Sequence, residues 1–420
     1  MNRNSCINKV VVFFTFCLLS MLTGCKDSPQ KSVLELAAET HETYGLMEEE
    51  QDLVRNGNDF SIQFFKKIAE EEGEKNIFVS TIGMFYSLNI INNGASGLTR
   101  QEICNALNID TTDIENVNKL CRRLMIGQAK VIEDEFLGPS SYMRSATLFQ
   151  AGKRINIDPS FQKVLENDYF AGIIKGNAKQ RKIDKWCEEQ TEGLLSSFPV
   201  KQNDDESANL LVANFFNGRW VQKFDKESTM KEPFKGGISS SVNMMNMMEK
   251  ENVFSYAKLD DFSILRIPYL GGYRLYIILP DKPDGLASLL QSLDGEKLRS
   301  AISQLRSYDH IYVKIPKFEV DYSFNANNYL TSLGVGKMFS DYAELNHIQS
   351  EPMKISDIIQ KTKVILDEDG TRASAITSSS FLTLSELMYP TEAYFYADHP
   401  FAYIIQDPFA NYCFMGTFWG

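Results

Sequence analysis

The spacing of hydrophobic residues along the chain predicts its first long helix. An Asn-Asp pair at positions 58 and 59 resembles an N-cap, and Glu71-Glu72-Gly73 ends the pattern. Between them, large apolar residues recur at intervals of three and four, as on one face of an α-helix: Phe60, Phe64, Phe65 and Ile68. This pattern predicts a core helix over about Asp59 to Glu72.

Short apolar or alternating runs predict buried strands between the helices. Three such runs occupy residues 76–81, 145–149 and 274–279, and the first leads directly into a long helical pattern. Because strands and helices are intermixed along the chain, with long connections between them, we expect an α+β fold with a large mixed sheet.

The stretch Lys361–Met388 combines two patterns. It begins with the β-rich run 364–366, passes through an acidic turn, and then has neither Gly nor Pro between Gly370 and Pro390. At a period of two, small residues share one face: Thr371, Ala373, Ala375, Thr377 and Ser379. This is the pattern of a loop that can also form a strand, although composition alone favours a flexible Ser/Thr-rich linker.

Composition and charge narrow the classes of partner. The chain has 420 residues, of which 43% are hydrophobic, so its core suffices for one large domain or two. The net charge is −12 and becomes more negative if Arg3 and Lys9 are lost with a leader. This charge argues against nucleic acid and anionic membrane surfaces as partners.

The amino-terminal residues predict export. Arg3 and Lys9 precede a short apolar run, Val10–Leu22, and Leu22-Thr23-Gly24-Cys25 resembles a bacterial lipobox. We therefore expect a lipoprotein signal peptide over 1–24, lipidation of Cys25 and a polar tether over 25–51, with the protein held on a membrane of the bacterial cell envelope, at the outer membrane or cell surface. The alternative is a retained transmembrane anchor, for which the apolar run is short.

Catalytic and metal-binding motifs are missing from the sequence. It contains no G-x-S-x-G, no H-E-x-x-H and no phosphate-binding glycine loop, and its four histidines are dispersed. The cysteines that would remain after export have no CxxC spacing, which favours buried thiols over disulfides or a metal site: Cys104, Cys121, Cys187 and Cys413. We expect no enzyme activity, no metal and no cofactor.

Two motifs near the carboxyl end resemble those of the serpin family. Residues 368–375 are similar to the Glu-x-Gly-Thr-x-Ala-x-Ala hinge of the serpin reactive-centre loop, and residues 395–401 to the segment that follows it. Further matches lie at residues 76–103, 183–193 and 213–245. The resemblance extends over residues 52–420 without an interior linker, which favours one domain.

The resemblance implies a serpin-like α+β fold with three β-sheets, about nine helices and an exposed reactive-centre loop at about residues 368–392. The loop's hinge would include Glu368, Gly370, Thr371, Ala373, Ala375 and Thr377. Counting from Gly370 as in the family, the reactive bond would be Leu384–Ser385, with Thr383 and Met388 as alternative positions. The apolar residues near this bond could instead pack on the domain surface.

The family also has a hydrogen-bonded cluster beneath the strands that open for the loop. The matching positions are Ser80, Asn214 and Gln360, and Trp220 matches the region where the strands separate. Thr81 and Gly83 depart from the family's Pro and Ser, and Gln360 replaces a histidine. Because an amide both donates and accepts, we expect the cluster to form without titrating.

The resemblance implies an inhibitor rather than an enzyme. In serpins, a protease cleaves the loop, the hinge side inserts into the central sheet, and the protease is trapped as a covalent acyl-enzyme. An apolar Leu384 predicts chymotrypsin-like, subtilisin-like or elastase-like serine proteases as partners, or a cysteine protease, and we expect a monomer. The alternative is a non-inhibitory serpin-fold binding protein at the cell envelope.

Overall fold

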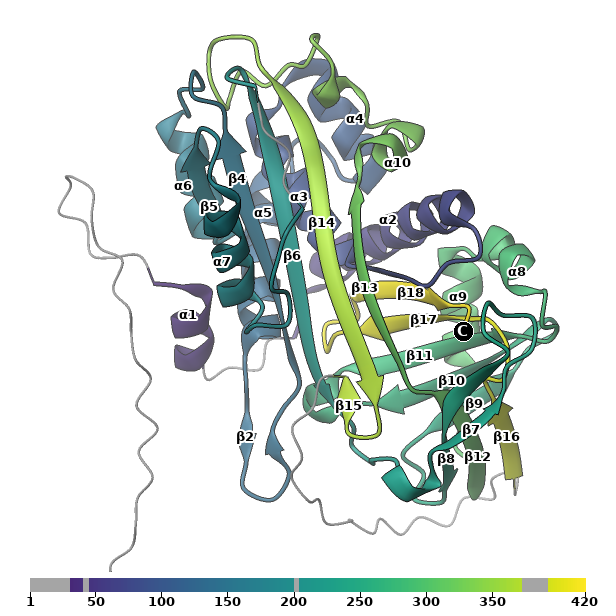
Figure 1. Cartoon of the computed structure of the whole chain (residues 1–420). Coiled ribbons are helices and arrows are strands. Elements are labelled where there is room, and N and C mark those ends of the chain that lie inside the picture. The colour runs from purple at the N-terminus through teal and green to yellow at the C-terminus, as the bar shows by residue number, and fades with distance from the viewer. Residues whose placement is uncertain (1–30, 41–44, 200–203, 372–391) are drawn as a thin grey trace, which may run out of the picture. The chain divides into compact units, whose positions relative to one another are not determined.

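The computed structural model describes residues 31–40, 45–199, 204–371 and 392–420. Residues 32–420 form one compact unit. Within the described residues, ten α-helices are intermixed with strands in several sheets, so the predicted α+β class is confirmed (Figure 1).

The largest mixed sheet, here called the central sheet, contains six strands. Their spatial order is β13 (Phe318–Asn325), β14 (Lys354–Asp367), β15 (Gly370–Thr371), β6 (Ser207–Arg219), β4 (Tyr142–Ala151) and β5 (Gly172–Lys175). The long strands β14 and β6 run parallel to each other, whereas β15 is antiparallel to both. The apolar run predicted at residues 145–149 forms the middle of β4.

Three further sheets are described. An antiparallel sheet has the order β1 (Ile77–Val79), β18 (Tyr412–Phe418), β17 (Phe401–Gln406), β11 (Arg274–Pro280), β10 (Phe262–Pro268) and β9 (Ser255–Lys258). A four-stranded sheet has the order β16 (Glu392–Tyr396), β12 (His310–Pro316), β8 (Ser241–Glu249) and β7 (Met230–Pro233). A hairpin of β2 (Glu133–Asp134) and β3 (Gly138–Pro139) makes one sheet more than the three that were predicted.

The helices lie on both sides of these sheets. In chain order they are α1 (Val33–Glu39), α2 (Glu48–Glu72), α3 (Thr81–Gly94), α4 (Gly97–Leu107), α5 (Ile114–Ala129), α6 (Pro159–Asp168), α7 (Gln180–Gln190), α8 (Leu286–Ser292), α9 (Gly295–Ser303) and α10 (Asn327–Ser332). Short 3₁₀ turns are η1 (Lys226–Ser228), η2 (Leu270–Gly272) and η3 (Lys337–Phe339). Helix α1 and the first residues of α2 lie within the segment predicted as a tether.

Helix α2 begins about ten residues before the start that the sequence predicted. Glu48, Glu49 and Glu50 form its first turn, where the helix dipole favours negative charge, and Glu50 accepts a hydrogen bond from the Met47 N–H (2.9 Å). The expected cap, Asn58, lies inside the helix. Its side-chain amide donates to the Ala410 carbonyl (2.8 Å) and accepts from the Tyr412 N–H (2.7 Å), so it bonds a distant segment and does not cap the helix. The predicted boundary was therefore wrong.

The central sheet is buried on both faces. One face packs on the main core, which contains alternate residues of β6 such as Leu210, Val212 and Phe216. The other face packs on α7 through a second cluster: Leu148, Ile183, Cys187, Leu195, Phe198, Leu211, Ala213 and Ile359. Figure 1 shows α7 at the β4–β5 side of the sheet, and through this cluster it also packs on β6, one of the two strands that flank the site described below.

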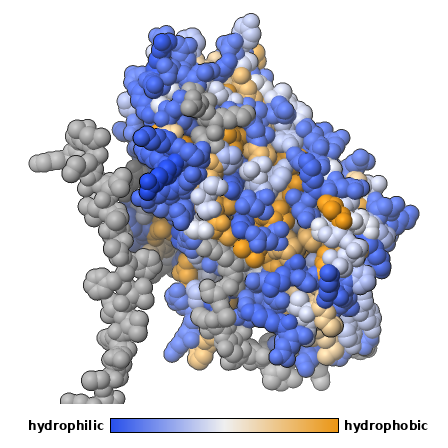
Figure 2. Space-filling model, in the orientation of Figure 1, coloured by the Kyte–Doolittle hydropathy of each residue, from blue (hydrophilic) through white to orange (hydrophobic). Residues whose placement is uncertain are grey.

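Hydrophilic residues cover most of the face shown in Figure 2, and hydrophobic residues gather near its middle. In the part of the chain that the structure describes, no helix has both the length and the apolar character needed to cross a bilayer, and no cluster of potential metal ligands is found. The four cysteines expected to be thiols are unpaired and buried, as predicted.

Candidate hinge site of the central sheet

The strands β14 and β6 are paired along part of their length and separated at one end. Their parallel ladder runs from Lys354 opposite Ser207 to Thr362 opposite Asn214. Beyond it, the two residues of β15 lie between the strands and pair with Leu366 and Asp367 on one side and with Gly218 and Arg219 on the other. A strand position in the sheet is therefore open at one end and closed at the other. We call β15, the turn 367–369 and the adjoining ends of β14 and β6 the hinge site.

Glycine is required at the first position of β15. Gly370 has φ +144°, and a Cβ there would lie 2.2 Å from the Gly218 carbonyl oxygen and 3.0 Å from the Arg219 Cα. Both contacts are with backbone atoms, which have little freedom to move. Gly370 therefore allows the chain to enter the sheet close to the backbone of β6, where no Cβ would fit.

The acidic turn before β15 is held by three lysines from other elements. Glu368 is buried, and its two oxygens accept from Lys317 Nζ (2.7 Å) and Thr229 Oγ1 (2.8 Å). Asp369 pairs with Lys223 Nζ (2.9 Å) and Lys226 Nζ (2.6 Å). These bonds fix the direction in which the chain enters the sheet.

The lysines favour the charged form of two of the three carboxylates in the turn. Burial alone would raise the pKa of Glu368, but the hydrogen bonds from Lys317 and Thr229 outweigh it and lower the pKa. Burial is likewise outweighed by Lys226 and Lys223 at Asp369, whose pKa is also lowered. At Asp367 burial dominates and raises the pKa. Glu368 and Asp369 therefore stabilise the folded hinge site when they are ionised.

Aromatic residues form the inner wall of the hinge site. The buried Thr371 hydroxyl lies 2.7 Å from the Tyr269 hydroxyl. Trp220 stacks on Tyr269, with ring centroids 4.2 Å apart, and its Nε1–H donates to the Asp367 carbonyl (2.9 Å). Sequence reasoning placed Trp220 near the separated strands, and the structure shows that it touches both the turn and the wall beneath β15.

Gln360 joins β14 to the helix beneath the sheet. Its Nε2–H donates to the Ser80 carbonyl (2.9 Å), and its Oε1 accepts from the Ser80 N–H (2.8 Å). Ser80 is the N-cap of α3 and accepts from the Gly83 N–H (3.2 Å). One amide thus satisfies both backbone groups of a buried residue, and neither side chain titrates near neutral pH.

Asn214 lies on β6 and has a different partner. Its Nδ2–H donates to Ser145 Oγ of β4 (2.9 Å), while its Oδ1 is buried without a partner among the described residues. A Cβ at Gly83 would lie 2.5 Å from this oxygen. Gly83 therefore provides the space that Asn214 occupies, which explains the glycine at this position. The structure brings Ser80 and Gln360 together and places Asn214 beside them.

Comparison with known proteins identifies the family. The family described as Serpin (serine protease inhibitor) matches residues 55–419. The chain belongs to the serpin family.

Among relatives, this serpin is 29% identical over 378 residues to the leukocyte elastase inhibitor of Equus caballus, covering 86% of this chain and 97% of the relative. It is 25% identical over 435 residues to an uncharacterized serpin-like protein of Methanosarcina acetivorans, covering 98% of each chain. Serpin relatives such as the horse protein are named as inhibitors and not as enzymes.

Solved serpin structures share the fold. Human thyroxine-binding globulin has a TM-score of 0.76 at 19% identity and covers 88% of this chain and 98% of its own. The thermophilic serpin tengpin in its native state has a TM-score of 0.76 at 23% identity and covers 90% and 96%. At these identities the likeness shows the fold alone.

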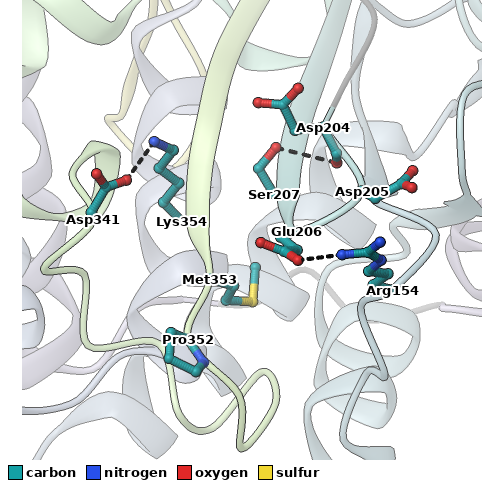
Figure 3. Close-up of a pocket in the computed structure, with 9 residues that line it drawn as sticks. All are labelled: Arg154, Asp204, Asp205, Glu206, Ser207, Asp341, Pro352, Met353 and Lys354. Atoms are coloured by element: carbon teal, nitrogen blue, oxygen red, sulfur yellow. Dashed lines mark hydrogen bonds and ion pairs between the residues drawn. The ribbon is translucent and has the colours of Figure 1, made fainter.

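A surface cavity of about 640 Å³ lies at the end of the central sheet where β14 and β6 are paired, opposite the end that holds β15. Figure 3 shows that it lies where β6 and β14 begin, with Ser207 and Lys354 on its walls. Ion pairs close its sides, between Lys354 and Asp341 (2.6 Å) and between Arg154 and Glu206 (2.7 Å). A strand that filled the whole position would end at this cavity.

Several predicted site residues lie outside the described part of the serpin. They are Cys25, Ala373, Ala375, Thr377, Thr383, Leu384, Ser385 and Met388. Conversely, sequence reasoning did not assign Lys317, Thr229 or Tyr269 to the hinge. Lys317 follows Pro316 in a motif of the family resemblance, but only the tertiary structure shows that its partner is Glu368.

Proposed function

We propose that this serpin inhibits serine proteases as a suicide substrate. A protease cleaves the segment that follows β15, the hinge side inserts between β14 and β6, and the attached protease is displaced before water completes the reaction. The supporting observation is the position of β15, whose two residues already occupy the first places of a missing strand. Insertion of the cleaved segment would lengthen β15 from Thr371 onward and leave Gly370 and Thr371 in their present pairing.

The register of β15 supports the predicted reactive bond. Gly370 lies opposite Arg219 and Thr371 opposite Gly218. In the same antiparallel register, the small hinge residues Ala373, Ala375 and Thr377 would face the positions of Phe216, Asn214 and Val212. The first residue of β6, Ser207, would then lie opposite Leu382, so cleavage after Leu384 leaves a segment just long enough to reach the cavity at the far end.

Insertion would release free energy by adding hydrogen bonds. The parallel ladder between β14 and β6 must open, and two antiparallel ladders replace it. The net gain is about one ladder, roughly a dozen bonds at about 0.5–1.5 kcal/mol each, or on the order of 10 kcal/mol. The small side chains on the hinge face suit the narrow space above Ser80 and Gln360.

The target and the location are parts of the same proposal. Leu384 fits a hydrophobic primary pocket, which favours chymotrypsin-like, subtilisin-like or elastase-like proteases and leaves a cysteine protease as an alternative. The similarity to a leukocyte elastase inhibitor supports an elastase-like target. We further propose that the protein acts as a monomer held in a bacterial envelope by lipid on Cys25.

A second candidate is a serpin-fold binding protein whose loop does not insert. Thyroxine-binding globulin, which shares the fold, has been solved in complex with thyroxine. The two candidates differ in the fate of the cleaved loop, because only an inhibitor requires insertion to follow cleavage.

Incubation with a panel of serine and cysteine proteases tests the proposal. We expect a band resistant to denaturant at the summed mass of the two proteins, and a released peptide that begins at Ser385.

The variant Thr371→Arg, which places a charge at a buried position, should be cleaved without trapping the protease, whereas Thr371→Ser should still trap it. Cleavage by every protease without a covalent complex would refute inhibition.

A further inference from the structure

The hairpin of β2 and β3 exposes apolar side chains at a projecting tip. Phe136 is 67% exposed, Ile132 50% and Val131 39%. Three neighbouring carboxylates are also exposed: Glu133, Asp134 and Glu135. Isolated exposed apolar residues are common, but three of them on one small hairpin, beside three acidic residues, form a surface suited to a partner.

The tip is held in one conformation. Asp134 Oδ1 accepts from the backbone N–H groups of Phe136 and Leu137, both at 2.8 Å. At the base, the Ser140 N–H donates to the Ile132 carbonyl (2.8 Å), and Ser140 Oγ accepts from the Ile132 N–H (2.9 Å). A preformed tip loses little conformational entropy on binding, so Phe136 is well placed to contribute affinity.

The base of the hairpin contacts the hinge site. Arg219 Nη1–H donates to the Pro139 carbonyl (3.1 Å), and the Arg219 N–H donates to Ser141 Oγ (2.9 Å). The same Arg219 lies opposite Gly370 in the sheet. Figure 1 shows the hairpin projecting beyond the end of the central sheet at which β15 lies. The base of the hairpin therefore lies beside Gly370, where the reactive segment starts, and the exposed tip projects from there.

We propose that the hairpin is a second docking site for the target protease, with Phe136 entering an apolar depression bordered by Lys or Arg side chains. The inference rests on the proposed function, because the partner is the enzyme that holds the reactive bond. Leu384 follows Thr371 by thirteen residues, which span at most about 45 Å, and a protease of roughly 230 residues has a radius of gyration of about 17 Å. An enzyme that holds the reactive bond can therefore reach the hairpin.

The composition of the tip indicates what each part contributes. A rigid exposed aromatic residue is a common centre of binding energy in protein interfaces. Carboxylates around it mainly increase the association rate with a basic surface and do so less at high salt. The docking site would thus select among proteases that accept the same loop sequence.

The test compares Phe136→Ala with Tyr342→Ala, a control that removes an aromatic residue with 82% exposure near the opposite end of the sheet. Binding is measured to a protease that the wild type traps in the panel experiment, with the nucleophilic serine of that protease replaced by alanine. This replacement separates docking from cleavage. We expect Phe136→Ala to weaken binding, and to slow inhibition by the active enzyme, roughly tenfold. The stoichiometry of inhibition should not change, and the control should match the wild type.

A second variant tests the charges. Glu133→Gln combined with Glu135→Gln should slow association about threefold to tenfold at low ionic strength, and the difference should vanish at high salt. Equal binding by Phe136→Ala, the double variant and the wild type, while covalent complexes still form, would refute the docking site alone. If the wild type traps no protease, the proposed function fails and this inference fails with it.

Discussion

At the residue scale, the hinge site depends on a few contacts that tolerate little change. Gly370 is required by its close approach to the backbone of β6, and Gly83 by its contact with the side chain of Asn214. Gln360 satisfies a buried serine whose backbone groups have no access to water. These contacts keep the strand position closed below β15, and in the proposed mechanism they would set how readily it opens.

Replacement of Gln360 by leucine should weaken this closure. The change leaves the buried Ser80 N–H without its partner, while the Ser80 carbonyl keeps the Met84 N–H (3.2 Å). The loss should cost about 1–3 kcal/mol and lower the melting temperature by about 2–4 °C. Thermal denaturation followed by circular dichroism measures the effect. The control Gln162→Leu, at an exposed position of α6, should change the melting temperature by less than about 1 °C, and an equal loss in both variants would contradict the assignment.

At the element scale, the acidic turn couples β14 to two other parts of the chain. Lys317 precedes β13, while Thr229, Lys223 and Lys226 lie between β6 and β7. The turn connects β14 to β15, so its stability determines whether Gly370 and Thr371 stay paired between β14 and β6. Since the contacts are ionic, their contribution depends on pH.

The hinge should lose stability in acid. Glu368 and Asp369 have lowered pKa values in the folded state, so they stabilise the fold above their ordinary values of 4.5 and 3.8, and this stabilisation is lost as the pH falls through the folded-state values. Asp367 opposes the effect, because its raised pKa favours the protonated form.

The variant Glu368→Gln tests this pH dependence. At pH 7 it should lower the free energy of unfolding by about 1–2 kcal/mol, and between pH 5 and pH 3 its melting temperature should fall less steeply than that of the wild type. Melting curves across this range make the comparison. Glu319→Gln removes a more exposed ion pair with Lys363 and should have little effect at either pH.

At the scale of the whole molecule, the proposed mechanism requires the native form to be less stable than the inserted one. The described structure has a sheet whose two longest strands are paired in parallel over most of their length, with a separate strand started at one end. The free energy of insertion is shared by the entire sheet and by no single residue. It should therefore appear in global unfolding.

Cleavage within residues 372–384 by a protease that escapes trapping should raise the melting temperature by about 10–15 °C, from a gain on the order of 10 kcal/mol. Differential scanning calorimetry before and after cleavage measures the change. An unchanged melting temperature would exclude insertion and favour the binding-protein alternative.

The amino-acid pattern alone determined much of the architecture. Apolar spacing predicted the core part of α2 and the strands β4 and β11, because burial of one face requires a period that can be read locally. The start of α2 was missed because the side chains of Asn58 and Asp59 bond residues far along the chain, Ala410, Tyr412 and Arg299, and do not cap the helix. Gly370 was predicted as a hinge residue because the motif that contains it is local.

Only the tertiary structure decided the partners at the hinge. Glu368 meets Lys317 across 51 positions in sequence, and Gln360 meets Ser80 across 280. No local pattern encodes such pairs, since each depends on which strands become neighbours and in which register they pair. The sequence thus predicted a segment able to form a strand, and the tertiary structure shows that its first two residues, Gly370 and Thr371, lie between β14 and β6.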